Sequence, residues 1–320
     1  MLRLLSFATF LAVCGVAAFP AGAQERGIKI VLGYPPGATS DTLSRLLADK
    51  MRQALGQPVI VENKPGAAGR IAPETVKTAP ADGSTLLLTP LANMVTFPHV
   101  YRDLRYDVFR DFTPLAHLAN FDLGLAVNVS VPAKTLKEYV ELVKKDQKMG
   151  DYASAGSGSL PHFFAVMFAR TAGIEMTHVP FKGTAPALQA LVGGQISAAS
   201  VVLSDIAQLH RGGKVRALAS SGSKRSSFLP ETPTFRELGY DIEGSGWYAL
   251  YAAAGTPPDA IARLSKAAVD GIRAADMQDK LANLFLEPTG LGPAELARIH
   301  KADYDKWGPV IRASGFTPND

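Results

Sequence analysis

A strand that stops at a Pro-Pro-Gly turn and is followed at once by a helix is the feature that most constrains this fold. The stretch is VLGYPPGATSDTLSRLL, residues 31–47. Apolar residues recur at helical spacing from Leu43 to Leu55, and Gly56 follows as a stop, so a helix is predicted over 39–55. The first N–H groups of a helix lack partners and carry about half a positive charge. The loop before this helix is therefore predicted to receive an anion without any Lys or Arg.

The same strand, loop and helix pattern recurs along the chain. Glycine-bearing loops precede helices again at 63–70, 153–159 and 182–184. Strands are expected over 28–33, 59–61, 85–89, 123–127, 196–202, 215–220 and 247–253, and helices over 136–145, 161–171 and 293–314. This alternation favours an α/β fold with a largely parallel sheet.

Residues 1–23 are typical of a secretory signal peptide. Arg3 precedes an apolar run over 4–18, and Ala21-Gly22-Ala23 is a small-residue cleavage site. The only cysteine, Cys14, lies in this segment. The mature chain is therefore expected to have no disulfide, no thiol nucleophile and no thiolate metal site.

Composition excludes some classes of partner. A chain with 47% hydrophobic and 19% charged residues is typical of a compact globular protein, and about 300 mature residues suffice for two lobes. The formal net charge is only +4 and the basic residues are scattered, so nucleic acid is not expected as a partner.

Catalytic motifs are poorly represented. Ser154, Ser157 and Ser159 lie near His162, which raises the alternative of a secreted hydrolase, but no serine has the G-x-S-x-G spacing of a nucleophile elbow. The six histidines show no H-E-x-x-H pairing and the chain has no Walker loop. A dinucleotide fingerprint is also poorly supported, because Gly244-x-Gly246 runs into an aromatic strand rather than a helix. We predict no catalytic residue, no cofactor and no metal site.

An ordered set of motifs resembles the periplasmic solute receptors of tripartite tricarboxylate transporters, the Bug receptors. The matching stretches are YPPGATSD from residue 34, VENKPGAAGRIA from 61, ADGSTLLL from 81, RDLRYDVFRDFTPL from 102, YASAGSGSLPHF from 152, HVPFKGTAPALQALVGGQI from 178, GGKVRALA from 212 and GWYALYAAAGTPP from 246. The chain departs from the usual pattern at Ala38, Phe181 and Ser197, where the family usually or often has Gly, Tyr and Asp.

The resemblance implies a two-lobed periplasmic binding protein of the type II-like, Venus-flytrap class with two crossover strands. It implies a monomeric receptor in the periplasm that closes on a small carboxylate and delivers it to the membrane permease of a tripartite transporter. The alternative is a periplasmic ligand sensor that acts on a signalling kinase. The expected divisions are signal peptide 1–23, first lobe 24–122 and 231–320, and second lobe 123–230.

Ligand-binding residues are predicted in the loops that precede the helices, with a few more on the strands and helices that face them. They are Tyr34, Gly37, Ala38, Thr39, Ser40, Asp41, Asn93, Ser154, Ala155, Gly156, Ser159, His162, Lys182, Gly183, Thr184, Asp205 and Trp247.

Several of these residues have a purely structural alternative. Asp41 either caps its own helix or accepts a hydrogen bond from an ammonium or hydroxyl group of the ligand. His162 is either a packed or capping residue or a ligand residue. Lys182 could be a solvated surface charge, Asn93 a turn residue and Trp247 part of the core.

Overall fold

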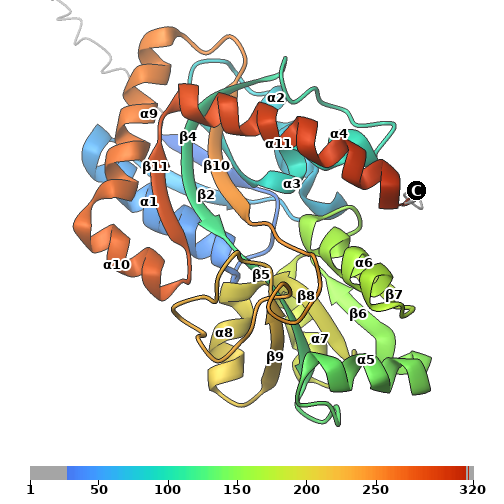
Figure 1. Cartoon of the computed structure of the whole chain (residues 1–320). Helices are drawn as coiled ribbons and strands as arrows, with labels where there is room; N and C mark the ends of the chain where they lie inside the picture. Colours follow the sequence, from blue (N-terminus) through green and yellow to red (C-terminus); the bar gives the residue numbers. More distant parts are fainter. Residues whose placement is uncertain (1–26, 315, 317–320) are drawn as a thin grey trace, which may run out of the picture.

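Two separate β-sheets, each covered by helices, form the two lobes of the molecule (Figure 1). The computed structural model describes residues 27–314 and residue 316, so the signal peptide predicted over 1–23 lies outside the described residues. The predicted two-lobed α/β architecture is confirmed.

The first lobe contains a six-stranded sheet in the order β11-β4-β10-β3-β1-β2. Its strands are β1 (Ile28–Leu32), β2 (Val59–Asn63), β3 (Thr85–Pro90), β4 (Phe112–Phe121), β10 (Gly246–Ala253) and β11 (Glu287–Leu291). Its helices are α1 (Thr39–Leu55), η1 (Ala67–Gly69), α2 (Ile71–Lys77), α3 (Leu91–Met94), α4 (Phe97–Val100), α9 (Pro258–Arg273), α10 (Ala275–Asn283) and α11 (Pro293–Ser314).

The second lobe contains a five-stranded sheet in the order β7-β6-β8-β5-β9. Its strands are β5 (Leu123–Asn128), β6 (Asp151–Ser154), β7 (Thr177–Pro180), β8 (Ala198–Val202) and β9 (Val215–Ser220). Its helices are α5 (Leu136–Lys145), η2 (Gln147–Gly150), α6 (Leu160–Ala172), α7 (Thr184–Val192) and α8 (Leu203–Arg211).

The expectation of a largely parallel sheet is wrong. β1 pairs parallel with β2 and β3, but β10 is antiparallel to both of its neighbours, and so is β5. The reason is the path of the chain between the lobes. β10 enters the first sheet from the second lobe, so it begins at the edge where β1 and β3 end, and β5 enters the second sheet in the same way.

Helix α1 forms as its periodicity predicts. Leu43, Leu47 and Met51 are fully buried against the first sheet, and each such side chain contributes about 1.5–3 kcal/mol by leaving water. Gly56 ends the helix with a left-handed backbone, φ 69°, a conformation that glycine adopts without steric cost. The loop between β1 and α1 is therefore held at both ends by buried elements.

The chain crosses between the sheets twice, and the two crossings are hydrogen bonded to each other. The first crossing is Asp122, between β4 and β5, and the second is the segment 221–245 between β9 and β10. The Ser221 hydroxyl donates to the Gly244 carbonyl at 2.7 Å and accepts from the Leu123 N–H at 2.9 Å. The Ser245 hydroxyl donates to Asp122 Oδ1 at 2.7 Å.

The terminal helix α11 lies across the first lobe and reaches α6 of the second (Figure 1). Trp307 packs against Phe164 with 6.0 Å between ring centroids. The predicted bounds of α5, α11 and β9 are confirmed, whereas α10, β11 and most of β4 were not predicted. None of the helices described within residues 27–314 is long and apolar enough to cross a membrane.

Candidate functional site

A small cavity lies where the two lobes meet. Its volume is about 40 Å³. The first lobe contributes the loop after β1, the start of α1, and the ends of β3, β4 and β10 that face the second lobe. The second lobe contributes the loop after β6, the starts of α6 and α7, and the end of β8. The lining residues are Tyr34, Ser40, Pro90, Ala92, Phe121, Ala155, Ser159, Leu160, Pro161, Thr184, Val202 and Tyr248.

Three helices begin at this cavity. Ser40 lies in the first turn of α1, Ser159 caps α6 by accepting from the His162 N–H at 3.4 Å, and Thr184 is the first residue of α7. The unpaired N–H groups of a helix start attract negative charge, and the attraction is stronger where water is excluded. The arrangement therefore suits an anion.

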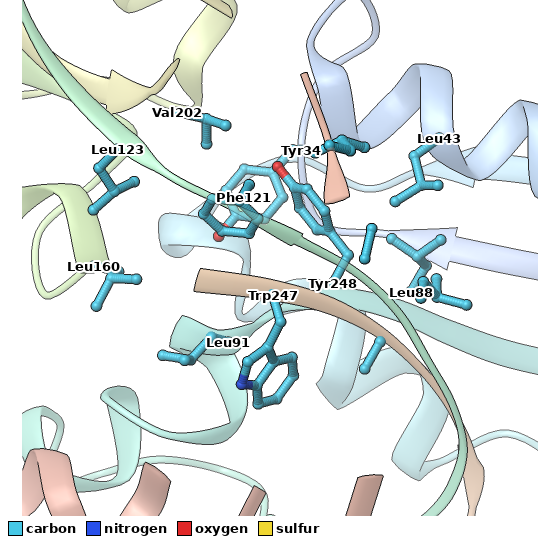
Figure 2. Packing of buried hydrophobic residues seen from close by; sticks show 14 of the residues in the cluster. Tyr34, Leu43, Leu88, Leu91, Phe121, Leu123, Leu160, Val202, Trp247 and Tyr248 are labelled. Carbon is cyan, nitrogen blue, oxygen red and sulfur yellow. The ribbon is translucent and has the colours of Figure 1, made fainter. Parts of the chain in front are cut away.

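The remaining lining is uncharged and mostly apolar. Figure 2 shows the rings of Tyr34, Phe121 and Tyr248 gathered on one side, with Leu160 and Val202 facing them from the second lobe. The Phe121 and Tyr248 ring centroids are 4.5 Å apart. A ligand here would have to place an apolar body against these rings.

The two lobes are in direct contact around the cavity. Thr96 donates from Oγ1 to the Gly158 carbonyl at 2.9 Å, and the Tyr101 hydroxyl donates to the Ser157 carbonyl at 2.6 Å. Thr39 N–H donates to Asp205 Oδ1 at 2.9 Å. These bonds join residues of opposite lobes, so the two lobes are closed against each other.

Two glycines make this close approach possible. A Cβ on Gly156, whose φ is 140°, would lie 2.8 Å from the Cβ of Ala68 in the other lobe. A Cβ on Gly183, whose φ is 117°, would lie 2.8 Å from Cδ of Pro35. Both separations are too short for carbon atoms, so larger residues would hold the lobes apart.

The structure brings only part of the predicted site together. Tyr34, Ser40, Ala155, Ser159 and Thr184 line the cavity. A second groove, about 620 Å³ and lined by residues of both lobes, contains Gly37, Ala38, Thr39, Thr184 and Asp205 among others. Neither lining includes Asp41, Asn93, Ser154, Gly156, His162, Lys182, Gly183 or Trp247.

Sequence reasoning missed more than half of the cavity lining, seven of its twelve residues. The residues not predicted are Pro90, Ala92, Phe121, Leu160, Pro161, Val202 and Tyr248. The ends of the strands could have indicated three of these residues. Pro90, Phe121 and Val202 are the last residues of β3, β4 and β8, at the edge of each sheet that faces the other lobe.

Comparison with known proteins agrees with this geometry. The model of the tripartite tricarboxylate transporter family receptor, TctC, matches residues 43–316. The chain belongs to this family. BugT of Bordetella pertussis is 30% identical over 324 residues, which cover 98% of each protein.

Two solved structures of similar proteins contain dicarboxylates. MatC from Rhodopseudomonas palustris with bound malate has a TM-score of 0.85 and 31% identity, over 92% of this chain and 100% of that one. Rpa4515 of R. palustris with adipate has a TM-score of 0.89 and 29% identity, over 92% of this chain and 99% of that one. The TctC family is a family of solute-binding receptors rather than enzymes.

In this TctC-family receptor, the Asp41 side chain is hydrogen bonded to residues of its own lobe. Its carboxylate accepts from Arg45 Nε and Nη2, both at 3.0 Å, and from Asn63 Nδ2 at 2.9 Å. Burial would raise the pKa of Asp41, but the hydrogen bonds from Arg45 and Asn63 outweigh it and keep the pKa below its usual value. Asp41 thus fixes the start of α1 to β2.

His162 lies on the other side of its loop from the cavity. Its ring stacks on His178 with 4.0 Å between centroids, and Nδ1 accepts from the Gly158 N–H at 3.1 Å. His178 Nε2 lies 2.7 Å from the Ser154 hydroxyl. Burial lowers the pKa of His162 to about 3, with a smaller contribution from His178, and lowers that of His178 to about 4.

We expect this pair to make the receptor sensitive to mild acid. An unfolded histidine takes up a proton near pH 6.5, whereas these two stay neutral in the folded chain until the pH reaches about 3–4. The stability that they contribute is therefore lost as the pH falls from about 6.5 towards 3–4. The loss at pH 5 should be about 2 kcal/mol for each residue. Urea unfolding at pH 7 and pH 5 measures it.

The His162→Asn variant is the control for this prediction, because an amide oxygen can still accept from Gly158. Its free energy of unfolding should fall less between pH 7 and pH 5 than that of the unaltered receptor. If the free energy of unfolding fell equally between pH 7 and pH 5 in both proteins, the role given to His162 would be contradicted.

The other predicted residues have structural contacts or face solvent. The Tyr34 hydroxyl donates to Asn93 Oδ1 at 3.3 Å, and Trp247 Nε1 donates to Asp303 Oδ2 at 2.8 Å. Lys182 is exposed. Among the described residues, no group of three His, Cys, Asp or Glu side chains is arranged to hold a metal ion.

Proposed function

We propose that this protein captures a small organic carboxylate between its lobes and delivers it to the permease of a tripartite tricarboxylate-type transporter. The observation that carries the proposal is the convergence of three helix starts on one cavity between lobes in contact. Membership of the TctC family and the malate and adipate in similar structures support it.

We propose that the carboxylate binds at the starts of α1, α6 and α7. Ser40, Ser159 and Thr184 would supply hydroxyl and backbone donors, with water bridging where a direct bond is too long. Tyr34 and Ala155 would contact the body of the ligand. Gly37, Ala38 and Thr39 would shape the first loop, and Gly156 and Gly183 would let the lobes close.

We propose that the receptor works in the periplasm as a monomer and opens at the two crossings. On this proposal the first lobe comprises residues 24–122 and the chain after the second crossing. Residues 233–235 run beside Ser220 of β9, with hydrogen bonds of 2.9 Å from Ser220 to Pro233 and from Phe235 to Ser220. This favours a hinge point close to Gly244. The sequence analysis expects the chain to return to the first lobe earlier, after residue 230.

Thermal-shift screening of residues 24–320 against small carboxylic acids tests the proposal. An acid present at about a hundred times its dissociation constant should add about 2.7 kcal/mol to the free energy of unfolding, because it binds only the folded state. Each acid is paired with its primary amide, which has nearly the same shape without the charge. The acid should raise the Tm and its amide should not.

Two outcomes would contradict the proposed function. One is that no acid of any class raises the Tm. The other is that amides raise the Tm as much as their acids, which would show that the site does not select negative charge.

A further inference from the structure

A carboxylate of the protein itself lies at the starts of two of the three helices. Asp205, near the start of α8 in the second lobe, is half-buried and lines the groove between the lobes. It accepts from the Thr39 N–H at 2.9 Å and also from the Thr39 hydroxyl. Burial raises the pKa of Asp205, and its neighbours Thr39 and Thr184, the first residue of α7, lower it in part. Asp205 therefore takes the Thr39 donors at the start of α1 that an anionic ligand would otherwise use, and it lies beside the start of α7.

We propose that Asp205 is a specificity-determining residue that restricts the ligand to one carboxylate on a compact apolar body. The inference rests on the proposed function and names the class of acid bound at the same site. Each helix start carries about half a positive charge, so one carboxylate offsets about two of the three. The remaining attraction suits a single ligand carboxylate.

The lining offers nothing to balance a second ligand charge. It contains no Lys, Arg or His, and the rings of Tyr34, Phe121 and Tyr248 occupy the side opposite the second lobe. A second carboxylate would lose its water without gaining a cation. The cavity volume of about 40 Å³ also favours a compact ligand.

Asp205 does not line the cavity, but it lies near Tyr248, which does. Burial raises the pKa of Tyr248, and the negative charge of Asp205 raises it further. The Tyr248 side chain is 3% exposed and lines the cavity, yet its hydroxyl has no hydrogen bond to any described residue. This hydroxyl is a free donor for a ligand oxygen, so Tyr248 orients the ligand while Asp205 limits its charge.

Matched pairs of acids test the proposal by titration calorimetry. The probes are hexanoate with hexanedioate, and benzoate with 1,4-benzenedicarboxylate. The unaltered receptor should bind the monocarboxylate of a pair about tenfold more tightly or better, since a second charge would be desolvated near Asp205. Asp205→Asn keeps an oxygen for the Thr39 N–H but removes the charge, so it should reduce this preference about tenfold.

Ser204→Ala is the structural control. Ser204 also contacts Thr39 across the lobes, with 2.8 Å between the hydroxyl oxygens, but it has no charge. Its loss should weaken both members of a pair equally and leave their ratio unchanged.

The outcomes separate the two proposals. A wild-type preference for the dicarboxylates, or an unchanged ratio in Asp205→Asn, would overturn the role of Asp205 while leaving acid capture intact. Failure of every acid to bind would overturn the proposed function as well. If Asp205→Asn does not fold, the ratio of the monocarboxylate and dicarboxylate affinities of the unaltered receptor decides the ligand class.

Discussion

Gly156→Leu is expected to abolish acid binding while both lobes stay folded. The new side chain would start 2.8 Å from the Cβ of Ala68 at the contact between the lobes, and Gly156 has a φ of 140° that other residues rarely adopt. The larger side chain would hold the lobes apart and so oppose closure. Overpacking of this kind costs about 1–3 kcal/mol. Affinity should fall by about 100-fold, measured by titration calorimetry with the best acid from the screen.

Two further variants separate closure from backbone strain. Gly173→Leu also replaces a glycine of positive φ, 62°, but its Cβ would meet nothing within 4 Å, so it should bind normally. Ala68→Leu enlarges the same contact from the first lobe and should weaken binding without altering Gly156. Normal binding by both Gly156→Leu and Ala68→Leu would refute the idea that the ligand is held by the closed arrangement.

Trp247→Ala is expected to have the largest effect on stability. The indole is 3% exposed and points away from Tyr248 into the first lobe (Figure 2). Its removal would leave a cavity and deprive the half-buried Asp303 carboxylate of its 2.8 Å hydrogen bond. The free energy of unfolding in urea should fall by about 3–5 kcal/mol.

The ligand response of the Trp247 variants distinguishes packing from binding. Trp247→Phe keeps a ring and should lose less stability than Trp247→Ala. Both proteins should still respond to the same acid at a temperature where they are folded. If Trp247→Ala kept its stability but lost the response, Trp247 would be a ligand residue instead.

Local features of the fold were predictable because their cause is local. Leu43, Leu47 and Met51 repeat at helical spacing and Gly56 stops the helix, so α1 and its preceding loop could be identified from a few consecutive residues. The direction of β10 could not be identified in this way, since it depends on which lobe the chain has just left.

The candidate site was only partly predictable for a related reason. Alternation along β10 shows that Trp247 and Tyr248 face opposite sides of the sheet, but only the placement of the second lobe decides which side is the cavity. The pairing of Asp205 with Thr39 joins residues 166 positions apart. No spacing rule in the sequence connects them.

The hydrogen bonds of Ser221 and Ser245 have a practical consequence. Because they tie one connecting segment to the other, the halves should swing about a single axis instead of twisting independently. A pair of fluorescent dyes, one on the outer face of each half, would then convert acid capture into one change of distance, which makes this chain a natural starting point for a sensor.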